Sequence, residues 1–543
     1  MQAAIVNTPH PVNEPVRFYA PGTTERAELK AAVARMSGDT IEIPMVIDGR
    51  EVRTGQVVDV RAPHKRSLLL ARAHEGGREH VAQAIDAALA AQKVWGEMPW
   101  TARAAVFLRA AELLATRYRP LLNAATMLGQ SKTAHQAEID AACELIDFLR
   151  FNVTYARQIA TEQPQSSPGT WNVMEPRPLE GFVFAATPFN FTAIAANLPA
   201  APAIMGNTVV WKPSANALLS AHWVMTLFRE AGLPDGVINM VMGDPAEVTK
   251  QCLEHPSLAG VHFTGSTPVF RSMWRKVGEN IDRYRTYPRL VGETGGKDFV
   301  FAHASADPTA LAVALVRGAF EYQGQKCSAA SRAYVPKSMW PALKERIVEL
   351  TRMIRVGDVA DFRNFMGAVI DGRAFARITG AVDEARRGGH AKLICGGEWS
   401  DAEGFFIEPT VMETDDPKHT LMETELFGPV LTVWPYDDGK EDEALAICDA
   451  TSPYALTGAV FARDRVFIEK ASTALRRAAG NFYVNDKPTG AVVGQQPFGG
   501  GRASGTNDKA GSVLNLLRWT SPRVIKENFE PPRAVPYPSQ SEP

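Results

Sequence analysis

Apolar residues in the first third of the chain follow the spacing of short strands and then of helices. Residues 41–60 hold short apolar runs around Asp48-Gly49-Arg50, a sequence typical of a hairpin turn. Farther on, apolar residues recur at i, i+3 and i+4 in three predicted helices, at residues 78–97, 101–117 and 134–158. Before all of these, we expect residues 1–40 to form an extended, loosely ordered lead-in.

From residue 182 the pattern changes, and short apolar runs alternate with helical stretches. The apolar runs predict four buried strands, at residues 182–186, 208–212, 237–241 and 260–263. The helical stretches between them include residues 218–231 and 245–254. This alternation is typical of a parallel, doubly wound α/β sheet, which binds its ligands at the carboxyl ends of its strands.

A second alternating series runs from Phe299 to Asn485 and predicts another α/β domain. Its strands are expected at residues 332–335, 430–436, 458–462 and 481–484. We therefore divide the chain into a first domain (41–159 and 181–305), a second domain (306–510), and an arm and tail (160–180 and 511–543). The arm contains the Pro- and Ser-rich run 163–169, and the tail contains a β-prone run at 514–525.

Composition and charge narrow the class of protein. The 543 residues are 45% hydrophobic and 22% charged with a net charge of −2, which is typical of a multidomain globular protein and favours neither nucleic acid nor an anionic membrane as partner. No apolar run has the length of a spanning helix, and the first seven residues do not resemble a signal peptide, so the cytoplasm is expected. The five cysteines are too scattered for a disulfide framework, and no metal-ligand spacing is present, so no metal site is expected.

Three residues in Gly- or Pro-rich turns carry candidate chemistry. Cys327 lies in Gln-Gly-Gln-Lys-Cys-Ser-Ala, Asn190 in Thr-Pro-Phe-Asn-Phe, and Glu293 in Gly-Glu-Thr-Gly-Gly-Lys. A thiolate attacks an aldehyde, an amide N–H₂ stabilises the resulting oxyanion, and a carboxylate activates the water that cleaves a thioester. Each residue alone also fits a plain structural role, as a buried thiol, a turn asparagine or a helix-capping carboxylate.

A nucleotide site is indicated by one turn and one lysine. Gly265 and Ser266 follow a predicted strand and open a helix, whose free N–H groups suit a pyrophosphate, although the run is not the G-x-G-x-x-G fingerprint. Lys212 closes another buried strand, where a cation reaches a ribose or a phosphate. Taken alone, the turn also fits simple helix capping, and the lysine also fits a solvated strand end.

Taken together, in this order and at these distances, the motifs resemble the aldehyde dehydrogenase superfamily from about Ile41 to Ile525. The resemblance implies a Rossmann-type NAD-binding domain, an α/β catalytic domain and a β oligomerisation arm. It assigns Cys327 as nucleophile, Asn190 as oxyanion donor and Glu293 as general base. It assigns the NAD contacts to Thr187, Lys212, Gly265, Ser266 and Glu425, the last in the run Glu-Leu-Phe-Gly-Pro. Ala215 stands where many NAD-preferring members have an acidic residue, so discrimination against NADP is expected to be weaker.

The finer resemblance is to the branch that oxidises glutamate γ-semialdehyde, the open form of 1-pyrroline-5-carboxylate. It is carried by the runs 127–132, 137–141, 145–148, 289–299, 481–487, 495–500 and, most distinctively, 503–509. In that branch the residue after the cysteine and a Gly-containing loop bind the substrate carboxylate, here Ser328, Gly490 and Ala491. Phe191 and Phe498 would flank the aliphatic stem, although either fits ordinary packing.

The resemblance predicts hydrolytic, NAD-dependent oxidation of this semialdehyde to glutamate, the second step of proline breakdown. The alternatives are another semialdehyde dehydrogenase, a CoA-acylating enzyme, which would not need Glu293, and a catalytically silent nucleotide-binding protein. The resemblance also implies at least a homodimer, with arm and tail pairing across subunits. The sequence shows one catalytic unit, so any proline dehydrogenase is expected on a separate polypeptide.

Overall fold

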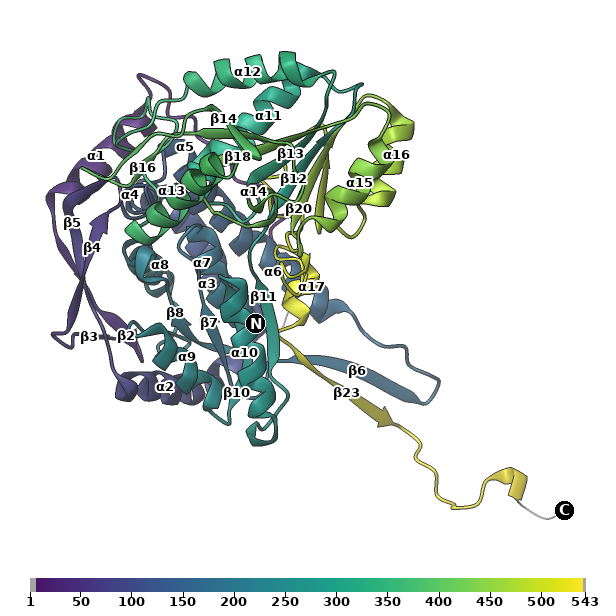
Figure 1. Ribbon diagram of the computed structural model, residues 1–543. Coiled ribbons are helices and arrows are strands. Elements are labelled where there is room, and N and C mark those ends of the chain that lie inside the picture. The colour runs from purple at the N-terminus through teal and green to yellow at the C-terminus, as the bar shows by residue number, and fades with distance from the viewer. Residues whose placement is uncertain (1–5, 541–543) are drawn as a thin grey trace.

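The chain folds around two seven-stranded sheets, described for residues 6–540 by a computed structural model (Figure 1). The first sheet has the order β11-β10-β7-β8-β9-β2-β3. Its strands from β11 to β9 are parallel, and β2 and β3 add an antiparallel edge. In that spatial order, the strands span Arg289–Glu293, Leu258–Thr264, Phe182–Ala186, Thr208–Lys212, Ile238–Met240, Met45–Ile47 and Arg50–Val52.

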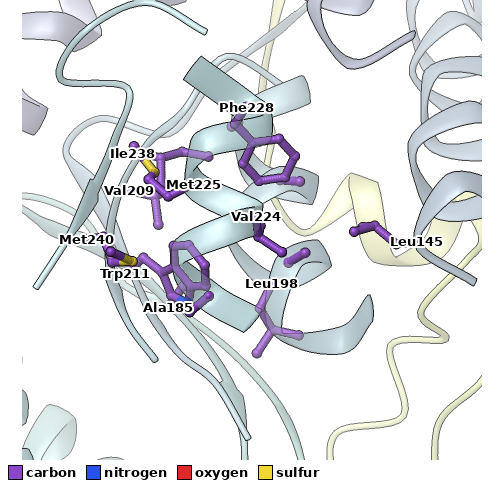
Figure 2. Packing of buried hydrophobic residues seen from close by; sticks show 14 of the residues in the cluster. Leu145, Ala185, Leu198, Val209, Trp211, Val224, Met225, Phe228, Ile238 and Met240 are labelled. Carbon is purple, nitrogen blue, oxygen red and sulfur yellow. The ribbon is translucent and has the colours of Figure 1, made fainter. Parts of the chain in front are cut away.

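Helices cover the first sheet and bury its apolar strands. Trp211 and Val209 of β8 lie beside Val224, Met225 and Phe228 of α8, as Figure 2 shows. Because both faces of a parallel sheet are covered, its strands are mostly apolar and buried. The helices of this half are α2 (Arg78–Glu97), α3 (Trp100–Leu113), α4 (Arg119–Gln130), α5 (Ala134–Ala137), α6 (Leu145–Thr161), α7 (Thr192–Ile204), α8 (Leu218–Glu230), α9 (Pro245–Glu254) and α10 (Thr267–Glu279).

The second sheet has the order β14-β17-β18-β13-β12-β20-β21 and is parallel except for β14. In that order its strands span Ala391–Cys395, Thr410–Thr414, Val430–Tyr436, Ala330–Pro336, Asp298–Ala302, Thr457–Phe461 and Asn481–Val484. Its helices are α11 (Pro308–Phe320), α12 (Trp340–Arg352), α13 (Gly372–Arg387), α14 (Thr420–Glu423), α15 (Glu441–Ala450) and α16 (Arg465–Ala474). The two predicted α/β series are therefore confirmed.

Smaller elements complete the fold. The hairpin turn at Asp48-Gly49 is confirmed, because Ile47 of β2 pairs with Arg50 of β3. A separate three-stranded sheet joins β1 (Ile41–Ile43), β5 (Lys65–His74) and β4 (Val57–Ala62). Two-stranded pairs join β15 (Trp399–Ser400) to β16 (Phe406–Ile407) and β19 (Tyr454–Ala455) to β22 (Gly501–Arg502). The structure also contains π-helical turns at Leu114–Tyr118 and Glu138–Glu144, and 3-10 turns at Ala215–Ala217, Ile281–Arg283, Glu321–Gly324 and Pro538–Gln540.

Three expectations about the organisation of the chain were wrong. The lead-in is not extended throughout, because α1 (Thr24–Gly38) buries Leu29 and Val33 in the core, while residues 1–5 lie outside the described part. The sheets change between β11 and β12, so the strand Asp298–Ala302 belongs to the second sheet rather than to a first domain that ends at 305. The tail begins with a helix, α17 (Val513–Leu517), whose Leu516 is fully buried.

The arm is a two-stranded ribbon that projects from the body (Figure 1). It pairs β6 (Thr170–Arg177) with β23 (Ser521–Asn528) in antiparallel register, so the tail strand does have a pairing partner within its own chain. Its exposed side chains include Trp171, Val524 and Ile525. No helix between residues 6 and 540 is long and apolar enough to cross a membrane. Within the same range, no group of His, Cys, Asp and Glu side chains is arranged to hold a metal ion.

Candidate active site

Cys327 lies in a loop whose backbone is held in an unusual conformation. Tyr322, Gln323 and Gly324 have φ values of 52°, 56° and 66°, so three successive residues are left-handed just before the cysteine. Such a run is costly for residues with a Cβ and persists only where the surroundings enforce it. This turn ends the helical segment that begins with α11 and directs the following residues toward the first sheet.

The side chain of Gln323 supplies the forces that hold this loop. It is fully buried, and its Nε2 donates to Ser131 O (2.9 Å) and to Ala368 O (2.8 Å), while its Oε1 accepts from Gly367 N–H (3.0 Å). One amide thus ties the loop to two other segments of the chain. Gln323 was not predicted as a site residue from the sequence, because only the tertiary structure brings its three partners together.

Asn190 lies against the same loop. Its side chain is 4% exposed, and its Nδ2 donates to Gln325 O at 3.1 Å, two residues before the cysteine. The following turn opens α7, and Asp140 accepts from the first N–H groups of that helix, those of Thr192 (3.0 Å) and Ala193 (2.9 Å). Since Asp140 also pairs with buried Lys132 (2.6 Å), a charged cluster fixes the position of Asn190.

Glu293 is the last residue of β11 and lies within electrostatic range of the Cys327 thiol. Its Oε2 accepts from Gly500 N–H at 3.0 Å. Burial raises the pKa of Glu293 well above its ordinary value, and the Gly500 N–H and the Lys509 ammonium act in the opposite direction. A carboxyl group with a raised pKa holds a proton more strongly, which suits a group that must accept one from water.

The Cys327 thiol is half-exposed among buried neighbours. Burial raises its pKa well above the ordinary value, and the carboxylates of Asp298, Glu425 and Glu293 raise it further. A negative environment therefore disfavours the thiolate form of Cys327.

The nucleotide-side candidates lie together at the carboxyl edge of the first sheet. Glu293 of β11 is in register with Thr264 of β10, and Ala186 of β7 is in register with Lys212 of β8. The turns that follow these strands carry Thr187, Gly265 and Ser266, so the sheet brings together all of the candidates that were assigned to strand ends. This is the edge at which parallel sheets bind ligands.

The turn at Gly265 fits a phosphate group. Ser266 precedes α10 and makes no capping bond, which leaves its hydroxyl and the first helical N–H groups available to an anion. A Cβ at position 265 would lie 2.6 Å from the Phe263 ring, so the close turn requires glycine. Lys212 is the last residue of β8, and burial lowers the pKa of its ammonium. The Thr187 hydroxyl accepts from Trp211 Nε1 (3.0 Å), which orients it and leaves its own O–H as a donor.

Glu425 lies between the nucleotide side and the thiol. Its Oε1 accepts from Gly296 N–H (3.0 Å), and a Cβ on Gly295 would lie 2.1 Å from its Oε2. Burial raises its pKa to about 7. Gly295 and Gly296 therefore let the Glu425 carboxylate approach the end of β11 closely. In this position the carboxylate can contact a ribose that lies beside the Cys327 sulfur.

The predicted carboxylate anchor lies next to the nucleophile. Ser328 Oγ donates to Thr489 Oγ1 at 3.0 Å, so the residue after the cysteine contacts the loop that contains Gly490 and Ala491. Phe191 is half-buried, with Lys132 Nζ 4.1 Å from its ring centroid. Phe498 is also half-buried and pairs through its backbone with Ala510.

Residues 51–525 match the model of the aldehyde dehydrogenase family. The chain belongs to this family. The arrangement of its site agrees, since an aldehyde dehydrogenase needs a thiol, an oxyanion donor and a carboxylate at a nucleotide-binding sheet edge.

This aldehyde dehydrogenase is similar to several proteins that carry the name of one enzyme. The chain is 50% identical over 533 residues to the probable delta-1-pyrroline-5-carboxylate dehydrogenase of Schizosaccharomyces pombe, with 97% of each chain covered. The solved delta-pyrroline-5-carboxylate dehydrogenase of Mycobacterium tuberculosis bound with NAD is 52% identical, with all of both chains covered and a TM-score of 0.96. The 1-pyrroline-5-carboxylate dehydrogenase from Thermus with bound NAD is 31% identical with a TM-score of 0.90, covering 97% of this chain and all of that one.

Two clusters of charged side chains near the active site of this aldehyde dehydrogenase were not predicted from the sequence. Lys132 and Asp140 lie in runs that were noted only for their resemblance, and their pairing depends on the π-helical turn Glu138–Glu144. Glu321 accepts from both Lys326 and Lys487 at 2.9 Å and so links the nucleophile loop to the anchor loop. No sequence signal predicts these pairs, because their members come from separate elements.

Proposed function

We propose that this chain oxidises L-glutamate γ-semialdehyde, formed from 1-pyrroline-5-carboxylate, to L-glutamate with NAD as hydride acceptor. The observation that supports the proposal is the hydrogen bond between Ser328 and Thr489, because it joins the residue after the nucleophile to the loop that we propose binds the substrate carboxylate. The relatives named for this reaction support it.

The proposed reaction has two halves, oxidation of the aldehyde to a thioester and hydrolysis of that thioester. Cys327 attacks the aldehyde carbon, and the Asn190 amide together with the Cys327 N–H stabilises the oxyanion of the thiohemiacetal. Lys212, Gly265, Ser266 and Glu425 would hold NAD, which would supply the acceptor for the hydride that leaves the thiohemiacetal carbon. Glu293 then removes a proton from the water that hydrolyses the thioester. The backbone N–H groups of Gly490 and Ala491 hold the far carboxylate throughout. The Ser328 hydroxyl, which donates to Thr489 Oγ1 in the free protein, turns to the carboxylate when the substrate binds.

Rates on different aldehydes test the substrate assignment. We expect kcat/KM on pyrroline-5-carboxylate to exceed that on propanal by about 10³-fold or more, because the anchor donors stay unpaired when the analogue lacks a carboxylate. Comparable efficiency on the two would contradict the proposal. A preference for succinate semialdehyde would favour another semialdehyde dehydrogenase, and CoA-dependent product release would favour the acylating class.

A substitution in the anchor loop sharpens this test. Gly490 has φ +98° and is exposed, and we expect Gly490→Val to reduce turnover of pyrroline-5-carboxylate far more than that of propanal. Gly389, with φ +81° and no atom within 4 Å of an added Cβ, provides a matched control at the end of α13. Gly389→Val should affect both substrates equally.

The arm supports a second proposal, that the protein is at least a homodimer. The ribbon of β6 and β23 exposes Trp171, Val524 and Ile525 away from its own body, and an exposed apolar ribbon favours pairing with a second chain. Light scattering of the full chain should give at least twice the monomer mass. A chain truncated after residue 520 should lose assembly or solubility, whereas a monomeric full-length protein would contradict the proposal.

Two further expectations concern the cellular setting. We propose a cytoplasmic enzyme that receives its substrate from a proline dehydrogenase on a separate polypeptide. Fractionation of the source cells tests the first point. Recovery of proline-to-glutamate conversion only when a separate proline dehydrogenase is added to the purified protein tests the second.

A further inference from the structure

The run Ala503–Lys509 is the most distinctive in the sequence, and none of its residues has a role in the reaction described above. In the structure it packs on the end of β11, which carries Glu293. Thr294 N–H donates to Ser504 O (2.7 Å), Thr506 N–H donates to Gly292 O (2.9 Å), and Gly292 N–H donates to Thr506 Oγ1 (3.0 Å). The run therefore forms one wall of the site around the proposed base.

The backbone of this wall is contorted. Arg502, Asn507 and Lys509 have φ values of 49°, 57° and 52°, although each carries a Cβ. Left-handed conformations at such residues are costly and occur where the surrounding structure enforces them, often at functional sites. One consequence is that the stem of Lys509 turns back toward the segment 480–499.

The ammonium of Lys509 is held by backbone oxygens. Its Nζ donates to Gly480 O (2.8 Å) and Gly499 O (2.9 Å), with a longer contact to Asn481 Oδ1 (3.3 Å). It has no direct ion pair with Glu293 among the described residues. Gly500, the residue that follows Gly499, donates its N–H to Glu293 Oε2 at 3.0 Å.

These two contacts meet in one peptide group. The carbonyl of Gly499 and the N–H of Gly500 belong to the same amide, so the ammonium binds one end of this amide and the carboxylate the other. A cation on the carbonyl oxygen polarises the amide and strengthens the N–H as a donor. We propose that Lys509 is a positioning residue that holds and ionises Glu293 through the Gly499–Gly500 peptide.

The other charges near Glu293 are compatible with this role. Lys509 is the cation with the largest effect on the pKa of Glu293 and lowers it, whereas Asp508 raises it. Asp508 accepts from Thr506 and pairs with Arg518 at 3.2 Å, so its charge is partly compensated. The Cys327 thiol is the third titratable neighbour, and burial together with the surrounding carboxylates raises its pKa.

This inference rests on the proposed base role of Glu293, so its test must separate the two. The measurements are the NADH burst on pyrroline-5-carboxylate and the rate of the deacylation that follows, recorded from about pH 5 to 10 with the full-length enzyme. Lys509→Met removes the ammonium and the hydrogen bonds, Lys509→Gln keeps a neutral donor, and Lys509→Arg keeps the charge. Lys470→Met is the control, since Lys470 lies on α16 and pairs only with Asp442 among the described residues.

We expect Lys509→Met to keep a burst of about one NADH per subunit while the acid limb of deacylation moves up by about one pH unit. The sign follows because loss of the cation raises the pKa of Glu293, which then stays protonated to higher pH. Lys509→Gln should behave like the Met variant, and Lys509→Arg should restore the wild-type limb. If Met disrupts folding, the Gln and Arg pair still decides the question.

An unchanged acid limb in the Met and Gln variants would overturn the inference, as would an equal loss of burst and deacylation. Glu293→Gln in the same assay keeps the two ideas distinct. If that variant deacylates at the wild-type rate, the base role itself is wrong. If it accumulates acyl-enzyme while the Lys509 variants keep the wild-type limb, only the role of Lys509 is wrong.

Discussion

The nucleotide side and the chemical side of the site are built differently. The nucleotide side consists of turns at adjacent strand ends of one sheet, with Gly265, Ser266 and Lys212 as its proposed contacts. The chemical side combines segments from both halves of the chain around Cys327 and is surrounded by buried charges. Binding a dinucleotide therefore requires mainly backbone geometry, whereas the thiol and the base require a specific electrostatic environment.

The largest effect expected from this division is that of Cys327→Ala. Oxidation should disappear, because the proposed scheme forms the thiohemiacetal on the Cys327 sulfur, while NAD affinity should stay within about twofold of wild type. Cys395→Ala is the matched control, since Cys395 is the other half-exposed cysteine and lies on β14, away from the site. Calorimetric titration with NAD and an NADH assay check both halves, and more than trace turnover in the Cys327 variant would contradict the covalent scheme.

Asn190→Ala should have the next largest effect. Loss of one oxyanion donor is expected to slow the NADH burst by about 10²–10³-fold with little change in NAD affinity. Stopped-flow absorbance resolves the burst from deacylation. A variant that slows only deacylation would remove Asn190 from the first step.

A smaller effect, confined to the nucleotide side, is expected at Ala215. This residue is exposed in the turn after Lys212, and Ala215→Glu should reduce kcat/KM for NADP by about tenfold while leaving that for NAD nearly unchanged, because the carboxylate repels a 2′-phosphate. Ala215→Gln provides the neutral control. Equal losses with both cofactors would show that position 215 does not face the ribose.

The smallest effect is expected at Glu425, which lies between the nucleotide side and the chemical side of the site. Glu425 belongs to the nucleotide side, yet its carboxylate raises the pKa of the Cys327 thiol. Glu425→Gln should therefore lower that pKa and speed iodoacetamide labelling of Cys327 in the absence of NAD, by about threefold at pH 8. Mass spectrometry of the labelled peptide measures the rate. Unchanged or slower labelling would show that the two sides are electrostatically independent.

Much of the fold was predictable because its strands are short, apolar and buried on both faces. The helices at 78–97 and 245–254 and the strand at 481–484 agree with the structure to the residue. The predictions failed at the ends of the chain. Leu29 and Val33 of α1 do have the i, i+4 spacing of a helix, and this short signal was overlooked. Leu516 and Trp519 are buried by tertiary packing rather than by strand pairing.

The sequence by itself determined the chemistry of this protein. Cys327, Asn190 and Glu293 lie in turns whose residue types and order identify an aldehyde dehydrogenase, and parallel strands place their carboxyl ends at one edge. Only the tertiary structure decided the environment of these groups. The amide of Gln323, the pairing of Lys132 with Asp140, and the peptide that joins Lys509 to Glu293 each link residues from separate segments. Such contacts follow from three-dimensional proximity, which local pattern and spacing do not encode.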